Sequence, residues 1–155
     1  MADRAPRQFG DYHLLEQIAI GGMAEVWRAR SVGLAGFEKI LVIKKILPEL
    51  AEDKKFVELF INEARIAVQL VHANIVQVFD LGELDGTYFM AMEFVDGLDV
   101  ARILRRLAHD AHVPISLVLY LGAEVLKALQ FAHQRRDDNG ALLNIVHCDI
   151  SPQNI

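Results

Sequence analysis

The stretch at 145–155 combines residue types that can do chemistry. It reads Ile-Val-His-Cys-Asp-Ile-Ser-Pro-Gln-Asn-Ile. Pro152 forbids a helix between Asp149 and Asn154, so the sequence predicts an extended loop. Such a loop can point a carboxylate and a carboxamide at one place, where the carboxylate accepts a proton from a hydroxyl and the amide oxygen binds Mg²⁺. The stretch is therefore a candidate catalytic loop. A polar turn after a buried strand is the alternative.

Length and composition bound the class of protein. The 155 residues suffice for one domain with a real core, and 53% hydrophobic with 24% charged residues indicates a globular chain. The net charge of −5 argues against nucleic-acid binding through bulk charge. The single Cys excludes an internal disulfide and fits a reducing compartment. No signal-peptide pattern is visible and no apolar run reaches the ~18 residues of a membrane span. We therefore expect a cytoplasmic protein without a membrane segment.

A glycine-tipped hairpin is predicted near the N-terminus, after a flexible lead-in at 1–11. Strands are expected at 12–20 and 25–30, with Gly21-Gly22-Met23 between them. With no side chains at its glycines, such a hairpin lets backbone N–H groups approach a phosphate. An ordinary tight hairpin is the alternative interpretation.

Two charged residues fall on faces that should be apolar. A strand is predicted at 37–47, where alternation places Lys44 on the same face as apolar residues. A helix is predicted at 53–71, and Glu63 lies within its apolar stripe. A buried carboxylate needs a partner or becomes neutral, and Lys44 is the nearby cation that also faces inward. We therefore predict that Lys44 and Glu63 form an ion pair lining a cleft. In the alternative, Glu63 lies at the edge of the stripe beside Arg65 or water.

The rest of the pattern predicts two more strands and two more helices, at 76–81, 88–94, 98–108 and 117–133. A turn is expected at 82–86, and Ser116 is the expected N-cap of the last helix. This last helix is apolar almost all round, which is typical of a helix in the middle of a large core. Little else in the chain can cover it, so its exposed flanks could support self-association.

Six features in order along the chain resemble motifs of protein kinases, and in particular of the bacterial branch of eukaryotic-like serine/threonine kinases. They are Ile18–Val26 for the loop G-x-G-x-x-G-x-V, Leu41–Lys44 for V-A-I-K, Glu63 for the helix glutamate, His72–Val76 for H-P-N-I-V, Met92–Gly97 for the hinge, and His147–Asn154 for H-R-D-x-x-x-x-N. Ala19 and Ala24 replace two glycines of the first motif, and Cys148 replaces the Arg of the last. The resemblance covers residues 12–155.

The resemblance implies an α+β, protein-kinase-like fold. A five-stranded antiparallel N-lobe sheet with one helix is expected at 12–96, and the first helices of a C-lobe at 97–155. The implied reaction is phosphoryl transfer from ATP, with Mg²⁺, to a hydroxyl of a protein substrate. The implied roles are phosphate positioning by Lys44, restraint of Lys44 by Glu63, orientation or deprotonation of the substrate hydroxyl by Asp149, and Mg²⁺ binding by Asn154. The implied nucleotide contacts are Ile18, Ala19, Gly21, Gly22, Val26, Val42, Lys44, the gatekeeper Met92, and the backbone of Glu93 and Val95.

Two residues of the candidate catalytic loop depart from the family. Cys148 stands where an Arg usually receives a phosphorylated activation loop, and Ser151 stands where a Lys usually lies near the transferred phosphate. The D-F-G metal ligand, the activation loop and the A-P-E segment of the family do not occur within residues 1–155. The chain therefore looks truncated, and we expect it not to transfer phosphate efficiently by itself.

Three other interpretations can be weighed against a kinase. A pseudokinase or nucleotide-binding scaffold fits the altered glycines, Cys148 and Ser151. A cysteine hydrolase using Cys148 and His147 is disfavoured, because neighbours in an extended segment point to opposite faces. A metal site at His109 and His112 is also disfavoured, because no further ligand pair has suitable spacing.

Overall fold

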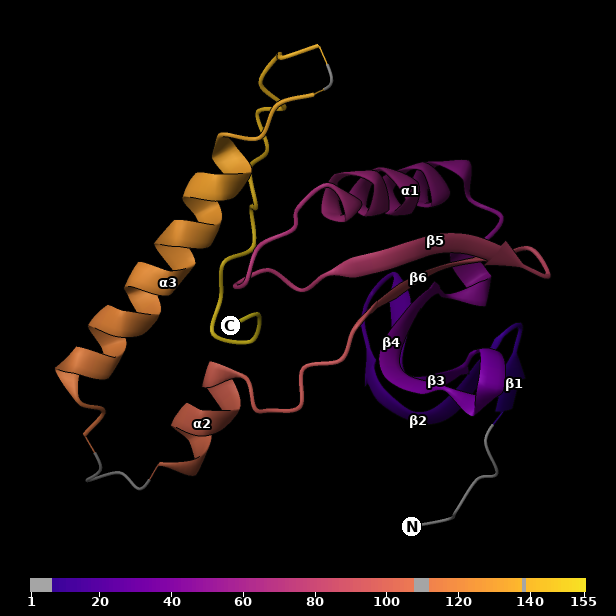
Figure 1. Cartoon of the computed structure of the whole chain (residues 1–155), viewed down its shortest axis with the longest axis horizontal. Coiled ribbons are helices and arrows are strands. Elements are labelled where there is room, and N and C mark those ends of the chain that lie inside the picture. The colour runs from indigo at the N-terminus through magenta and orange to yellow at the C-terminus, as the bar shows by residue number, and fades with distance from the viewer. Residues whose placement is uncertain (1–6, 108–111, 138) are drawn as a thin grey trace. The chain divides into compact units, whose positions relative to one another are not determined.

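The computed structural model describes residues 7–107, 112–137 and 139–155, and the chain folds into two compact units (Figure 1). The first unit comprises the chain up to Gln69 together with Val76–Phe94, and the second comprises Leu70–Ile75 with Val95–Ile155. The chain passes between units at Phe94–Val95, just before the boundary expected at 96–97. The short segment Leu70–Ile75 belongs with residues that follow much later in the sequence.

An antiparallel sheet forms the first unit. Its six strands are β1 (Arg7–Phe9), β2 (Tyr12–Ile20), β3 (Ala24–Val32), β4 (Glu38–Ile46), β5 (Val78–Leu84) and β6 (Thr87–Glu93), in the order β1-β2-β3-β4-β6-β5. Two short 3₁₀ helices, Leu34–Gly36 and Pro48–Leu50, flank β4. The predicted α+β architecture, with an antiparallel sheet and one α-helix in the first unit, is confirmed, with one strand more than expected.

The additional strand is β1, which lies in the segment predicted as a flexible lead-in. Phe9 pairs with Tyr12 across a tight turn in which Gly10 has a φ of +56°. The Phe9 ring packs edge-on against Phe89, with 5.1 Å between ring centroids. Three residues are too few to show strand alternation, so this aromatic contact could not be read from the pattern.

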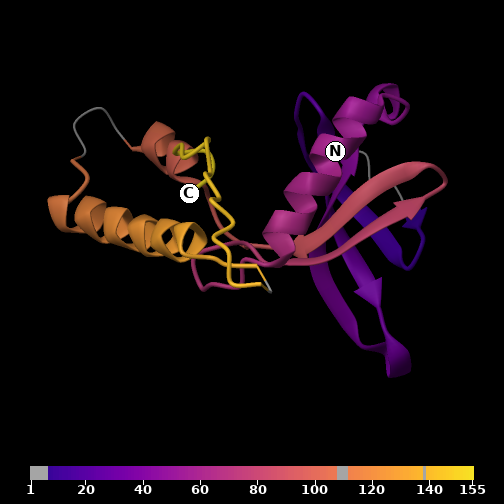
Figure 2. The ribbon, with the colours of Figure 1, turned by 90° about the horizontal axis from the view of Figure 1, so that it is seen from above.

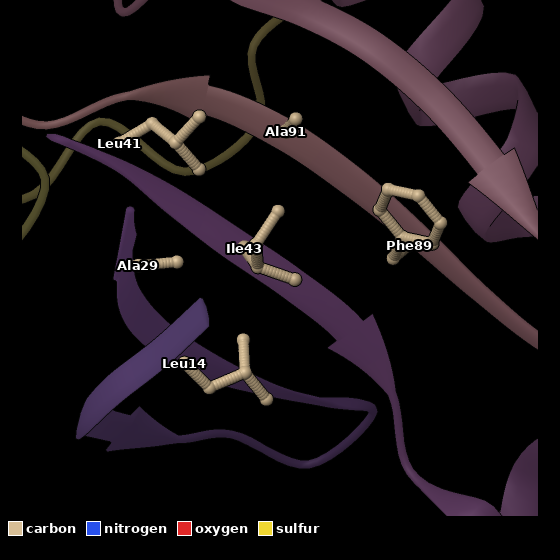
Figure 3. Close-up of a cluster of buried hydrophobic side chains, with 6 residues drawn as sticks. All are labelled: Leu14, Ala29, Leu41, Ile43, Phe89 and Ala91. Atoms are coloured by element: carbon tan, nitrogen blue, oxygen red, sulfur yellow. The ribbon is translucent and has the colours of Figure 1, made fainter. Parts of the chain in front are cut away.

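Apolar side chains gather on both faces of the sheet. One cluster consists of Leu14, Ala29, Leu41, Ile43, Phe89 and Ala91 (Figure 3). The other consists of Ala24, Ile46, Phe60, Ala64, Val78 and Met90, and it includes residues of helix α1 (Lys54–Val68), which runs beside β5 (Figure 2). Leu41 and Ile43 therefore face away from Ile46, as the alternation of β4 predicts.

Helix α1 begins one residue later and ends three residues earlier than the predicted range 53–71. Asp53 is its N-cap, and the Asp53 carboxylate accepts a hydrogen bond from the Lys55 N–H at 2.9 Å. Phe60 and Ala64 are its buried residues. Their spacing of four places them on one face of the helix, which packs on the sheet.

Gly82 lies within strand β5, although the sequence predicted a turn at 82–86. The turn is instead at Asp85–Gly86, where both residues have positive φ. Gly82 is opposite Phe89 in the register of β5 and β6, and a Cβ at Gly82 would lie 2.6 Å from the Phe89 Cζ atom. The glycine is therefore needed for the close approach of an aromatic ring, and not for a turn.

The second unit contains helices α2 (Val100–Arg106) and α3 (Ile115–His133). Helix α2 is shorter than the expected 98–108, whose last residue lies outside the described residues. Helix α3 begins before Ser116, which is not its N-cap. Pro114 is the N-cap instead, and its carbonyl accepts the Leu117 and Val118 N–H groups at 2.9 and 3.3 Å.

Asn74 joins the segment Leu70–Ile75 to the middle of α3. Its amide nitrogen donates to the Glu124 carbonyl at 3.1 Å and to the Glu124 carboxylate at 2.7 Å. The pKa of the Glu124 carboxyl is held below its ordinary value, first by a hydrogen bond from Lys127 and then by the bond from Asn74. The His72 ring lies 5.2 Å from the Phe131 ring in the same unit.

Helix α3 is long and apolar enough to cross a membrane by length and composition. This corrects the expectation that no apolar run reaches that length. The helix also carries Glu124 and Lys127, which form an ion pair at 2.6 Å. The same length and composition are typical of the central helix of a larger folded domain.

Gly82→Ala is expected to lower the free energy of unfolding by about 1–3 kcal/mol, because an added methyl group would overpack the cluster around Phe89. Urea unfolding of the intact protein measures the change. Gly22→Ala is the control, because no heavy atom beyond its chain neighbours lies within 4 Å of its Cβ position. Its expected change is below about 0.5 kcal/mol. Equal losses in the two variants would contradict this account of Gly82.

Candidate functional site

Lys44 of β4 and Glu63 of α1 form the ion pair predicted from the sequence. The Lys44 Nζ atom lies 2.6 Å from the Glu63 Oε1 atom, and 5.8 Å from the centre of the Phe60 ring. The Lys44 side chain is 26% exposed and the Glu63 side chain 49% exposed. Glu63 is therefore not buried as the helical stripe suggested. It lies at the edge of the apolar face formed by Phe60 and Ala64, and it still reaches Lys44.

The hairpin between β2 and β3 carries five of the predicted nucleotide contacts, namely Ile18, Ala19, Gly21, Gly22 and Val26. The Gly21 N–H donates to the Ala24 carbonyl at 2.8 Å, which closes the tip. Ala19 pairs with Val26 across the hairpin.

Both alanines that replace family glycines fit this hairpin without strain. The non-glycine residues with positive φ in the described part of the chain are Ala35, Asp85, Asn144 and Cys148, so neither Ala19 nor Ala24 needs a left-handed backbone. The Ala24 methyl group is buried in the apolar cluster on the α1 side of the sheet. The alanine at this position therefore anchors the hairpin tip to the core.

The predicted hinge begins at the end of β6. Met92 pairs with Val42 of β4 and packs against the cluster on the α1 side. The Glu93 N–H donates to the Gln77 carbonyl at 2.8 Å, and the Glu93 carboxylate accepts the Gln77 N–H at 3.2 Å. Because its N–H is engaged, Glu93 can offer a ligand only its carbonyl group. Val95 is exposed and is the first residue of this segment in the second unit.

Asp149 and Asn154 are in contact in the second unit. The Asn154 amide nitrogen donates to the Asp149 carboxylate at 2.9 Å and to the Asp149 carbonyl at 3.0 Å. The Asn154 N–H donates to the Ser151 carbonyl at 2.9 Å, which closes a turn around Pro152. These bonds hold the Asn154 amide group through its nitrogen, so its oxygen stays available to a ligand. The Asp149 carboxylate and the Asn154 amide thus lie together on one short loop, as their spacing predicts.

Helix α2 anchors this loop through its backbone, a feature that the sequence analysis missed. The Val100 N–H donates to the Ile155 carbonyl at 2.8 Å, and the Ala101 N–H donates to the Pro152 carbonyl at 2.9 Å. The first N–H groups of a helix have no partner within the helix, so they are available for such contacts. The only sequence signal was Asp99, whose carboxylate caps α2 by accepting the Arg102 N–H at 2.7 Å.

Cys148 has a left-handed backbone with a φ of +61°. For a residue with a side chain this conformation costs about 1–2 kcal/mol. The Cys148 Sγ atom lies 3.5 Å from the Val146 carbonyl, whereas the His147 Nδ1 atom accepts the Asp149 N–H at 3.3 Å. Cys148 and His147 thus have different partners, which gives no support to a cysteine–histidine hydrolase.

The oxygen atoms of Asp149 and Asn154 fit a hard cation such as Mg²⁺. Among the residues that the structure describes, no group of three His, Cys, Asp or Glu side chains could hold a metal by itself. Mg²⁺ usually binds one or two protein oxygens and takes its other ligands from substrate phosphates and water. The loop suits that mode of binding. His109 of the disfavoured histidine pair lies outside the described residues.

A sheet lysine held by a helix glutamate, together with an Asp–Asn loop in a helical unit, defines the protein kinase class of phosphotransferases. The chain belongs to the protein kinase family, because the family model for the protein kinase domain matches residues 12–155.

Relatives from three bacteria support this assignment. The chain is 43% identical over 148 residues to the tyrosine-protein kinase MasK of Myxococcus xanthus, with 95% of the chain and 23% of the relative covered. It is 34% identical to the serine/threonine-protein kinase PrkC of Bacillus subtilis, with 94% and 20% covered. The crystal structure of the PknI kinase domain of Mycobacterium tuberculosis matches with a TM-score of 0.71 at 30% identity, covering 99% of the chain and 58% of that structure. The chain thus spans less than a quarter of the two curated relatives.

Lys44→Met and Glu63→Gln are each expected to lower the free energy of unfolding by less than about 1 kcal/mol, because their pair is partly exposed. Lys45→Met is the comparison. The Lys45 Nζ atom lies 2.7 Å from the Glu25 Oε1 atom, and these side chains are only 11% and 14% exposed. Because this pair is more shielded from water, breaking it is expected to cost more, about 2–3 kcal/mol. Urea unfolding of the three variants measures the difference. A loss above about 2 kcal/mol for Lys44→Met would contradict the assignment of Lys44 to a pair with little structural role.

Proposed function

We propose that this chain is the nucleotide-binding and catalytic-loop portion of an ATP-dependent, Mg²⁺-requiring protein serine/threonine kinase. The observation that carries the proposal is the 2.6 Å contact between Lys44 and Glu63. A lysine that is held by a carboxylate but still partly accessible can present a fixed positive charge to phosphate oxygens. Membership of the protein kinase family supports the same role.

Most of the residues that would bind and orient the nucleotide lie in the first unit. The backbone at Gly22 can approach phosphate oxygens, since no heavy atom beyond its chain neighbours lies within 4 Å of its Cβ position. The Gly21 N–H already donates to the Ala24 carbonyl, so Gly21 would contribute by the absence of a side chain. Lys44 would hold the phosphates, and Glu63 would restrain Lys44. The adenine contacts would come from Val42, Met92, the Glu93 carbonyl and the backbone of Val95. Ile18 and Val26 would contact the same nucleotide.

The loop of the second unit would act on the protein substrate. Asp149 would accept the proton of the substrate hydroxyl or orient that hydroxyl toward the phosphate. Asn154 would fix Asp149 through its amide nitrogen and offer its amide oxygen to Mg²⁺. When bound, Mg²⁺ neutralises charge on the phosphates.

Serine or threonine is the proposed acceptor, supported by the names of PrkC and PknI, which are serine/threonine kinases. MasK is named a tyrosine kinase, and Ser151 departs from the usual serine/threonine pattern. Tyrosine is therefore the second candidate acceptor.

A nucleotide-binding scaffold without transfer activity is the second candidate function, favoured by Cys148 and Ser151. The protein substrate is unknown, and we propose a cytoplasmic site of action from the single exposed cysteine.

In a longer protein that contains a D-F-G segment, Asp149→Asn is expected to lower the rate of phosphate transfer by at least about 100-fold, because the general base is lost. The affinity for ATP should stay within about twofold of the original, since Asp149 lies outside the proposed nucleotide contacts. Radiolabelled transfer to a mixed peptide library, followed by phosphoamino-acid analysis, measures rate and acceptor together. Label on tyrosine alone would overturn the serine/threonine assignment and support the second candidate acceptor.

Residues 1–155 should be assayed beside a longer protein that contains a D-F-G segment. In kinases the metal is held jointly by the catalytic-loop Asn and the D-F-G Asp, so residues 1–155 are expected to bind nucleotide but to transfer phosphate poorly. Comparable transfer by both proteins, abolished in each by Asp149→Asn, would contradict this expectation. ATP binding without transfer in the longer protein would support the scaffold alternative.

Cys148 leads to a prediction about regulation. Without an Arg at this position, a phosphorylated activation loop lacks its usual cationic partner. Phosphatase treatment of the longer protein should therefore change its rate by less than about twofold, whereas Cys148→Arg should make the rate sensitive to phosphatase. A tenfold loss on treatment of the unmodified protein, about 1.4 kcal/mol of barrier, would contradict the prediction.

A further inference from the structure

Lys45 is the neighbour of Lys44 on β4, and it forms a separate ion pair on the opposite face of the sheet. Its partner Glu25 lies directly across on β3, with 2.7 Å between Lys45 Nζ and Glu25 Oε1. With side chains 11% and 14% exposed, this pair is the most buried ion pair in the described part of the chain. Because these side chains are more shielded from water than those of the other pairs, removing one partner leaves the other charge poorly solvated.

The surroundings of Glu25 keep the pair charged. Burial by itself would raise the pKa of the Glu25 carboxyl, but the favourable interactions, led by the hydrogen bond from Lys45, together outweigh burial and hold that pKa below its ordinary value. The Gln17 amide nitrogen of β2 also donates to the Glu25 carboxylate at 2.7 Å. The Lys45 Nζ atom lies 5.6 Å from the centre of the Phe9 ring of β1. Side chains of four strands thus meet at this pair.

The pair lies at the base of the glycine hairpin. Glu25 follows Ala24, which closes the tip through the Gly21 N–H. The Leu47 N–H donates to the Met23 carbonyl at 3.0 Å, so the end of β4 also binds the tip through its backbone. Strand β4 is therefore attached to the hairpin by Lys45 and to α1 by Lys44.

We propose that the Lys45–Glu25 pair is a positioning element that sets the place of the glycine hairpin relative to Lys44, and thereby the affinity of the site for nucleotide phosphates. The proposal rests on the proposed nucleotide-binding function. Neither residue touches the ligand in this account. Both act through the hairpin, whose N–H groups and Lys44 must bind the same phosphates together.

Glu25→Gln in the intact protein tests the proposal, with ATP and adenosine as the two probes. Adenosine lacks phosphates, so its binding reports on the contacts to adenine and ribose without those to phosphate. Glu25→Gln is expected to weaken ATP binding about tenfold, or about 1.4 kcal/mol, and to leave adenosine binding within about twofold. A purely structural role would instead weaken both ligands in parallel, or neither.

Glu38→Gln is the matched control. Glu38 pairs with Arg30 at 3.1 Å, and this pair joins the same two strands at the end far from the hairpin. Glu38→Gln should leave the ratio of ATP affinity to adenosine affinity unchanged. Where Glu25→Gln does not fold, the double variant Glu25→Gln/Lys45→Met leaves no unpaired charge at this position, and it should show the same selective loss of ATP affinity.

The outcomes separate the two proposals. If the unmodified protein binds ATP and the Glu25 variants keep the same ratio of ATP affinity to adenosine affinity, the positioning role is overturned and the proposed function stands. If the unmodified protein binds neither ATP nor adenosine, both proposals are overturned.

Discussion

Strand β4 pairs with β3 on one side and with β6 on the other, and its two-residue alternation decides where each neighbouring side chain goes. Leu41 and Ile43 enter one apolar cluster, and Ile46 enters the cluster under α1. The same alternation sends Lys44 and Lys45 to opposite faces. A slip of one residue would exchange the lysines and turn all three buried residues to the wrong face, so apolar burial keeps both charged pairs in register.

Elements with strong periodicity could be predicted from the sequence, because one buried face imposes one pattern. Strand β2 and the Lys44–Glu63 contact are examples. Strand β1 could not be predicted, since it is too short to alternate and depends on the distant Phe89 ring. Gly82 was misread because a glycine gives the same signal whether it allows a turn or makes room for an aromatic ring. In each miss, the deciding partner lies elsewhere in the sequence.

Features of the candidate site that depend on local sequence could likewise be predicted, whereas those that depend on distant partners could not. Asp149 and Asn154 were predictable because a proline and a short spacing confine them locally. Glu63 was found through its place in the apolar stripe of the helix. Its exposure was not predicted, because a helical stripe shows which way a side chain points and not how deeply it is buried. The contacts of α2 with the catalytic loop are backbone bonds and leave no trace in residue types. The ion pair of Lys45 was not predicted, because nothing in the strand pattern reveals that Glu25 and side chains of β1 and β2 lie beside it.

The segment Leu70–Ile75 has a consequence for the order in which the molecule can assemble. It leaves α1 and precedes β5, yet it belongs to the second unit, where Asn74 binds Glu124 at a separation of 50 residues. During synthesis the strands of the sheet emerge before α3, so the sheet can pair while this segment still has no partner. Closing so long a loop costs chain entropy that grows only slowly with length. The connection between α1 and β5 therefore becomes fixed only when the second unit is complete. This links the folding of early residues to residues that are translated much later.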